Sequence, residues 1–459
     1  MSTSEPNTSL ERLYRETGWT LRQCAQAINR IGTEQGTPAR YRPPSVHQWL
    51  NGSLPRDGAR PLILEAFARK LGRPVTPLEA GFPAPDTGAE AATNNTVDGI
   101  IDLGRTDMDP SRRSVLNAAL FSVALSVPDW PDVVGRMESA QRGARTRLGM
   151  SDVATVAAMT EQLSSMDDQF GGRTARPLAA AFLVNTVAVF LRTDGPDDVR
   201  RAMMSAASDL CYLTGYMAVG EGLHGLAQRY YLKALELAGA SEDHLTFCTT
   251  LRGMSVQAVD LGQGPIAMRL ADAAAASSPG AGPRMRAFLS GQQAHAAAQI
   301  GDHRSARMYL TEAEAAMERA ESRGKAFGSY SPSSLNYHTS QVRFEMGDLN
   351  GAVAAMQESD RLRYSIYRRT RVKERAILAE RQLAIGHLEA ACSSWGLALD
   401  DYPQVNSGRI DKRMADMFHL IAPHLKNRDA QALNERARTI VRPGLVPALS
   451  ASDAGRRRR

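Results

Sequence analysis

The sequence has few of the residue patterns that catalysis or disulfide bonding needs. Its four cysteines lie far apart without metal-site spacing, so we expect each to be a small buried residue in a reducing cytoplasm. It has no Gly-x-x-x-x-Gly-Lys-Ser/Thr loop, no His-Glu-x-x-His and no nucleophile elbow, and its nine histidines are scattered singly. We therefore expect no enzymatic activity, no cofactor and no metal.

Long apolar runs and period-two alternation are also lacking. We find neither an N-terminal signal peptide nor an apolar run of membrane-spanning length, which predicts a cytoplasmic protein with few strands. Arg112-Arg113 before an apolar run resembles a twin-arginine export signal, but it begins more than a hundred residues into the chain. We expect the first helix of a folded domain there instead.

Lysine is scarce as well, with six lysines against 49 arginines. This bias, together with abundant alanine, indicates a GC-rich genome such as that of an actinobacterium. The arginines therefore cannot all be interpreted as functional, and a net charge of +6 over 459 residues does not by itself imply nucleic acid.

What the sequence does contain is a spaced repeat of glycine followed five residues later by alanine. A glycine tolerates the positive φ needed where one helix ends, and alanine lets the next helix approach closely. A small residue recurs at position +12, where it falls on the same helix face. The glycines are Gly222, Gly262, Gly301, Gly347 and Gly386; the alanines are Ala227, Ala267, Ala306, Ala352 and Ala391.

This pattern resembles the tetratricopeptide repeat, and Gly301-Asp302 and Gly347-Asp348 match its turn directly. The steps of 39 to 46 residues exceed the usual period of about 34. HEAT-like pairs have longer periods but lack the Gly-x-x-x-x-Ala turn, so we favour the tetratricopeptide interpretation. The predicted fold is all-α, with a small helix-turn-helix domain followed by an α-solenoid of tetratricopeptide-like helix pairs over residues 110–450.

Residues 9–82 carry four helical patterns, which begin at Ser9, Thr20, Ser45 and Pro61. Residues 83–109 are rich in Pro, Gly, Ala, Thr and Asn, which predicts a flexible linker. The phrases GWTLRQCAQAI, SVHQWLNGSLP and LEAFARKLG resemble, in that order, the second, recognition and closing helices of xenobiotic-response-element (lambda-repressor-like) regulators.

The resemblance implies a DNA-reading helix, whose N-terminal, outward side chains enter the major groove. Val46, Trp49 and Leu50 are expected to pack inward. Arginines fix the register on phosphates, and amides read adenine edges. The predicted DNA-binding residues are Ser45, His47, Gln48, Asn51, Arg22, Gln23, Arg40, Arg42 and Arg56.

One departure from the family is an insertion at residues 31–43, within the glycine- and proline-containing segment between Arg30 and Pro44. It either adds a phosphate-contacting loop or displaces the recognition helix and abolishes DNA binding. We favour retained binding, because Trp49 and Gly52 keep the family's spacing.

Arrays of helix pairs curl, and the first helix of each pair lines the concave surface, which suits a peptide or helix. Counting back from each glycine in the tetratricopeptide register gives the expected groove residues; the alternative is that these side chains merely face solvent. They include Tyr212, Tyr216, Arg252, His295, Gln299, Tyr337, Gln341 and Lys373.

A second basic region, Arg361 to Arg375, holds seven basic residues. We expect a solvated helix whose basic side chains pair with acidic neighbours. The more specific alternative is a site that binds an anion or DNA. Residues 451–459 form a basic tail, which adds non-specific attraction to polyanions.

The domain order resembles peptide-pheromone regulators and actinobacterial tetratricopeptide regulators, and the arginine bias favours the second. The resemblance implies a transcriptional regulator that binds double-stranded DNA, as a homodimer, with an array that dimerises or senses a peptide, small molecule or protein. The alternative is an adaptor that holds protein partners in the array and no longer binds DNA.

Overall fold

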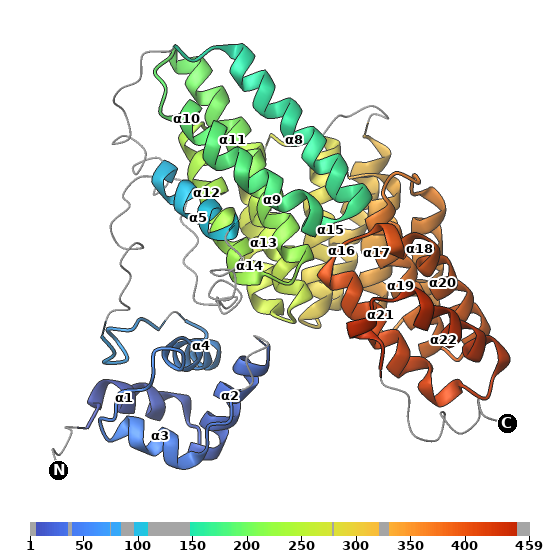
Figure 1. Ribbon diagram of the computed structural model, residues 1–459, viewed down its shortest axis with the longest axis horizontal. Coiled ribbons are helices and arrows are strands. Elements are labelled where there is room, and N and C mark those ends of the chain that lie inside the picture. Colours follow the sequence, from blue (N-terminus) through green and yellow to red (C-terminus); the bar gives the residue numbers. More distant parts are fainter. Residues whose placement is uncertain are drawn as a thin grey trace.

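The computed structural model describes residues 6–34, 39–73, 75–83, 96–108, 147–277, 280–320 and 330–447, and these residues form helices and connecting turns without a strand. Figure 1 shows a small helical N-terminal domain and a long array of stacked helices. The predicted all-α class, with a solenoid after a small domain, is confirmed. The expected helix after Arg112-Arg113 and the basic tail lie outside the described residues.

Four helices build the N-terminal domain around one apolar core. Helices α1 and α4 bring together Leu13, Ile63 and Phe67, each no more than 1% exposed, and Phe82 closes the core at its far end. Trp19, just before α2, packs against Phe67 with the two rings tilted and their centroids 5.9 Å apart. The helices are α1 (Thr8–Thr17), α2 (Leu21–Glu34), α3 (Pro43–Leu50) and α4 (Arg60–Leu71).

Local sequence sets the helix starts, but not always at the expected residue. The first helix is capped by Asn7, whose side chain accepts from Leu10 N–H, rather than by Ser9. The third begins at Pro43, two residues before Ser45, because prolines favour the first turn of a helix. The second starts after Thr20 as expected.

The predicted linker 83–109 contains a helix, α5 (Thr96–Met108), that belongs to the array. Val97, Ile100 and Leu103 are buried, and Asp107 forms a buried ion pair with Arg176. Tyr230 donates to the same carboxylate at 3.1 Å. Gly99 and Gly104 made this segment look like linker, but their small size allows close packing, because a Cβ at Gly104 would meet Val184.

The array proper consists of antiparallel helix pairs. Its helices are α8 (Met150–Phe170), α9 (Gly172–Phe182), the π-helical turn η1 (Leu183–Val187), α10 (Ala188–Leu191), α11 (Asp197–Gly220), α12 (His224–Ala240), α13 (His244–Asp260), α14 (Gly264–Ala276), α15 (Pro283–Gln299), α16 (His303–Glu318), α17 (Pro332–Glu345), α18 (Leu349–Leu362), α19 (Arg368–Ala384), α20 (Leu388–Asp401), α21 (Gly408–Ile421) and α22 (Arg428–Ile440). Short 3₁₀ turns η2 (Tyr402–Gln404), η3 (Ala422–His424) and η4 (Pro443–Leu445) join or follow the last helices.

Each predicted repeat glycine lies between the two helices of a pair with a positive φ, from 68° to 84°. All five following alanines are fully buried, and so are the small residues at +12. The packing logic of the repeat is thus confirmed: the glycine reverses the chain, and the alanines let the paired helices touch.

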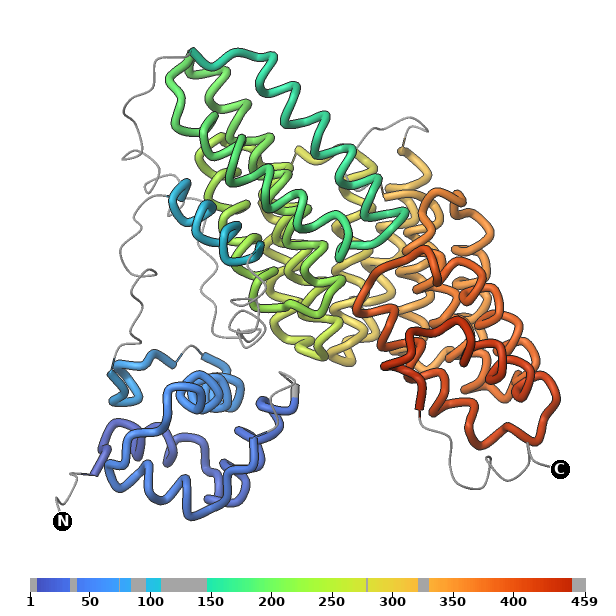
Figure 2. Tube along the Cα trace, viewed as in Figure 1, coloured from blue at the N-terminus to red at the C-terminus, as the bar shows by residue number. Residues whose placement is uncertain are grey.

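The two ends of the array meet. The start of α9 hydrogen bonds to the segment before α21: Asn406 N–H donates to the Phe170 carbonyl at 2.7 Å, and Arg173 N–H to the Asn406 carbonyl at 3.3 Å. Gly171, with φ 88°, allows this approach, because any Cβ there would collide with the Asn406 backbone. Figure 2 shows the α8–α9 turn reaching the red C-terminal helices. The α8–α9 turn and the segment before α21 are therefore in contact, and we call the side of the array lined by the first helices of its pairs the inner face.

One described helical stretch, Gly172–Leu191, has the length and apolar composition that a membrane span requires, with a mean hydropathy of 1.5. A single such stretch is weak evidence for a membrane-spanning helix. Ala175, Ala179, Leu183 and Val187 along it are buried against neighbouring array helices.

Candidate nucleic-acid interface and inner polar cluster

The face of α3 that should read DNA is exposed. Val46 and Trp49 are 2% and 8% exposed and pack into the domain core, as predicted. His47, Gln48 and Asn51 are exposed. Ser45 is half-buried in the first turn, and its N–H donates to the Arg42 carbonyl.

The exposed polar residues differ in their own contacts. The Asn51 amide nitrogen lies 3.1 Å from His47 Nδ1, one helical turn away, so these two side chains hydrogen bond to each other. The Gln48 side chain is exposed and makes no hydrogen bond to another described residue. Gln48 is therefore the side chain on this face that is readiest to pair with a base edge.

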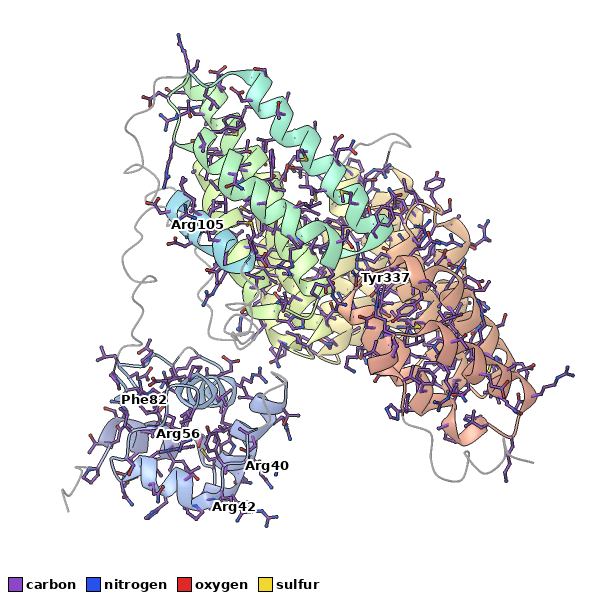
Figure 3. The ribbon with its side chains drawn as sticks, in the orientation of Figure 1. Arg40, Arg42, Arg56, Phe82, Arg105 and Tyr337 are labelled. Carbon is purple, nitrogen blue, oxygen red and sulfur yellow. The ribbon has the colours of Figure 1, made fainter. Side chains whose placement is uncertain are left out.

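Arginines around α3 are distinguished by the absence of ion pairs. Arg40 and Arg42 precede the helix, Arg56 follows it, and Arg22 lies in the first turn of α2; all four are exposed. Within the described chain none of their side chains makes an ion pair or hydrogen bond, and the same holds for the side chains of Arg30 and Lys70. Figure 3 shows Arg40 and Arg42 projecting from one side of the domain.

The other arginines of the domain are neutralised by carboxylates. These pairs are Arg12 with Glu16, Arg15 with Glu11, Arg60 with Asp57, Arg69 with Glu65, and Arg73 with Glu16 and Glu79. Uncompensated positive charge therefore borders α3, where an approaching phosphate would meet it.

Gln23, a predicted DNA contact, caps its own helix. Its side-chain oxygen accepts from Thr20 N–H at 2.9 Å, and Thr20 Oγ1 accepts from Gln23 N–H at 3.3 Å. This is the reciprocal capping box. Gln23 is exposed, but holding the helix start already uses its amide.

The segment between α2 and α3 leaves α3 packed in the domain core. Residues 30–34 continue α2, and Ile31 is 2% exposed, so the insertion is shorter than expected. The Asn29 amide binds the Tyr41 backbone twice, at 2.8 Å to its carbonyl and 2.7 Å from its N–H. The Tyr41 ring meets Trp49 edge-on at 5.0 Å. These contacts fix the loop's exit to α2 and α3; residues 35–38 lie outside the described residues.

In the array, the predicted groove residues lie on the inner face, but several are buried or bonded to neighbours. Tyr212 and His295 are 5% and 6% exposed. Gln299 donates to the Val259 carbonyl at 2.8 Å and ties two helices together, and Gln341 bonds to Arg381. Tyr216, Arg252, Tyr337 and Lys373 are half-buried.

We call Arg252, His295, Tyr337, His338, Lys373, Asp260 and Arg409 the inner cluster. Each comes from the first helix of a pair, from α13 to α21. Successive contacts join them: Lys373 Nζ lies 4.3 Å from the Tyr337 ring centroid, and Arg409 lies 2.7 Å from Asp260. His295 and His338 have ring centroids 6.3 Å apart.

Burial disfavours the charged form of both histidines in the inner cluster. Burial lowers the pKa of His295 to about 4 and that of His338 well below its usual value, with Arg252 adding to both effects. His338 Nε2 lies 3.4 Å from an Arg252 amino group, and an arginine only donates, so Nε2 accepts. The proton then lies on Nδ1, 2.7 Å from the Tyr330 hydroxyl.

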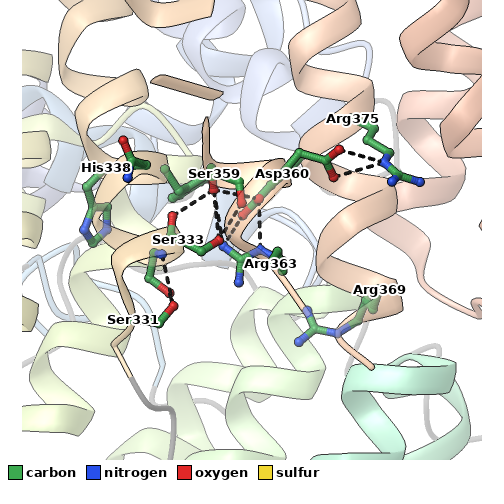
Figure 4. Close-up of polar contacts among 12 residues, drawn as sticks. Ser331, Ser333, His338, Ser359, Asp360, Arg363, Arg369 and Arg375 are labelled. Carbon is green, nitrogen blue, oxygen red and sulfur yellow. Dashed lines mark hydrogen bonds and ion pairs between the residues drawn. The ribbon is translucent and has the colours of Figure 1, made fainter. Parts of the chain in front are cut away.

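Six of the seven cations between Arg361 and Arg375 are paired to carboxylates, as expected. The expectation of a single solvated helix is wrong, because the segment spans the turn between α18 and α19 and the Arg363, Arg369 and Arg375 side chains are only 9–11% exposed. Figure 4 shows Arg363 at Ser359 and Arg375 at Asp360. Lys373 is the exception, because within the described chain it has no carboxylate at ion-pair distance. Its burial lowers its pKa to about 7.

Repeat counting did not identify Phe288, His338 or Arg409. Arg409 lies after the last repeat glycine, where the register ends, and His338 falls beside a predicted position. No group of three or more metal-binding side chains lies together in the described ranges.

Comparison with known families gives a match in the N-terminal domain. Residues 10–83 match the family model described as SP15 N-terminal domain. This match spans the apolar core from Leu10 to Phe82. No curated protein was found to match the chain.

Proposed function

We propose that the protein is a sequence-specific DNA-binding transcriptional regulator whose helical array dimerises or senses a ligand. The observation that carries the proposal is the contrast in the N-terminal domain: the arginines bordering α3 lack carboxylate partners, whereas five others are paired. Unpaired arginines lose no ion pair when they bind phosphate. The sequence resemblance to xenobiotic-response-element regulators supports the same assignment.

In this proposal, two kinds of side chain around α3 have different roles in binding DNA. Arg22, Arg40, Arg42 and Arg56 set the register on phosphates, and Gln48 reads a base edge from α3, with His47 and Asn51 beside it. A homodimer places two copies of α3 on half-sites roughly 34 Å apart, or at multiples of that spacing. Ligand binding in the array then changes the spacing of the two domains and so the affinity for DNA.

The alternative, an adaptor that grips a partner in an open groove, is disfavoured by the meeting of the array's ends. The Phe170–Asn406 hydrogen bond and the Arg369–Asp167 ion pair join helices that an extended open groove would keep apart. The contact of Tyr41 with Trp49, which holds the end of the insertion against α3, supports retained DNA binding.

Binding to genomic fragments over a salt series tests the proposal. Arg42→Ala should lower the slope of log affinity against log salt by about 0.9, the contribution of one phosphate contact. Arg15→Ala removes the same charge from the same domain, but Arg15 is paired with Glu11, so its slope should match wild type. Equal slopes for all three proteins, or no DNA binding by wild type, would reject the proposal in favour of the adaptor.

A further inference from the structure

We propose that the inner cluster binds a small organic anion that carries an aromatic ring, with Arg252 and Lys373 holding the anionic oxygens. The inference rests on the proposed function only in taking this binding as the sensing event. The site itself is argued from uncompensated charge, aromatic surface and solvent access.

The charge argument begins with two cations that lack a carboxylate partner. Arg252 is surrounded by neutral groups: its guanidinium lies 3.9 Å from the Phe288 ring centroid, and it also bonds to His338 and Tyr212. Its Nε is buried without a hydrogen-bond acceptor. Lys373 Nζ lies over the Tyr337 ring. No ion pair is made by either residue within the described ranges.

These two cations lie around the same histidine. Lys373 contacts Tyr337, whose ring lies 5.9 Å from His338, and His338 in turn meets Arg252. His338 must stay neutral to accept from Arg252, so it orients the guanidinium without compensating its charge. An anion between α13 and α19 would therefore face two positive groups.

The other charges near Lys373 are already paired. Glu374 binds Arg363 at 2.8 Å, Asp260 binds Arg409 at 2.7 Å, and Arg369 binds Asp167 at 3.0 Å. Burying an ammonium group without a partner costs stability. A bound anion would supply the missing partner of Lys373. Anion binding therefore explains the position of this ammonium group, whereas packing alone does not.

Aromatic surface and solvent access complete the argument. Tyr337 and Tyr216 are half-buried on the inner face, and Phe288 lies beneath Arg252. The Arg409 and Asp260 side chains keep 28% and 22% of their surface accessible although they face inward. The meeting of the array's ends favours a small ligand over an extended peptide.

Calorimetric titration of the full chain tests the inference with three probes: phenyl phosphate, benzoate and inorganic phosphate. We expect saturable binding of at least one aromatic anion, at least tenfold tighter than inorganic phosphate. Lys373→Met should weaken it tenfold or more, and Lys412→Met, which removes an exposed lysine outside the cluster, should leave it unchanged.

Lys373→Met replaces a half-buried ammonium group that has no carboxylate partner, so it should fold at least as well as wild type. Arg252→Met provides a second variant from another helix. Absence of saturable binding by both aromatic anions, or unchanged affinity in both cluster variants, would overturn the site. If inorganic phosphate bound as tightly as the aromatic anions, the inference that the site recognises an aromatic ring would be rejected. DNA binding by wild type is measured in a separate experiment without ligand. A failure of the anion site therefore does not reject the DNA-binding proposal.

Discussion

Arg369 of α19 lies 3.0 Å from the carboxylate of Asp167 on α8, and this ion pair joins two ends of the array. The Arg369 and Asp167 side chains are 11% and 4% exposed. Arg369 also lies over the Tyr216 ring on the inner face. One side chain therefore links closure of the array to the surface where a ligand is proposed to bind.

Replacing Arg369 with Met should destabilise the array by about 3–5 kcal/mol, because it leaves a buried carboxylate without its partner. Urea unfolding followed by circular dichroism measures the loss. Arg361→Met, which breaks the exposed pair with Glu358, should leave the unfolding midpoint unchanged. Similar midpoints for both variants would show that the closure contributes little.

Lys373→Met should be more stable than wild type at pH 7, and this difference should shrink as the pH rises toward 10. The pKa of Lys373 is lowered to about 7 by burial, against 10.5 for the ordinary side chain. Between these values the unfolded chain binds more protons than the folded one, so the wild type gains stability with rising pH. Urea midpoints of both proteins at pH 7, 8.5 and 10 check the trend; a constant difference would contradict it.

Gly301→Ala should destabilise the array by about 1–2 kcal/mol, since φ is 79° there and the left-handed conformation disfavours a Cβ. No atom lies within 4 Å of a Cβ at this position, so the cost is one of backbone conformation. Gly282→Ala is the matched control, because its φ is −65° and its surroundings are equally open. Equal effects at both positions would argue against the turn geometry.

Asn29→Ala should weaken both the N-terminal domain and its binding to DNA. It removes two hydrogen bonds to Tyr41 and leaves backbone groups unsatisfied, at a cost of about 1–3 kcal/mol. The loop that carries Arg40 and Arg42 would lose its anchor to α2. Gln26→Ala, an exposed change on the same helix, should alter neither stability nor affinity. Full DNA affinity in Asn29→Ala would show that the loop plays no part in binding.

Much of the array could be predicted because its determinants are local. A positive φ requires glycine within a few residues of each helix end, and Ala306 or Ala352 at +5 follows from helix geometry. Pairing of the basic segment also followed from its charge pattern. Repeat counting even placed Lys373 on the inner face, although its lack of a partner required the positions of α17 and α21.

Contacts between distant segments could not be predicted. Asp167 and Arg369 belong to different repeats, and nothing in the spacing of glycines indicates that the array's ends meet. Helix α5 was missed because Gly99 and Gly104 obscure its apolar positions. The end of α2 was misplaced because Ile31 looked like part of an insertion, whereas it packs into the domain core.

The most direct test of sequence-specific binding is the affinity of wild type and Gln48→Ala for a fragment selected from genomic DNA and for a scrambled copy. Wild type should prefer the selected fragment, and Gln48→Ala should lose about 1–3 kcal/mol of that preference, the value of one base contact, with its affinity for the scrambled copy unchanged. Failure to select any fragment, or an unchanged preference in Gln48→Ala, would contradict the assignment of α3 as the reading helix.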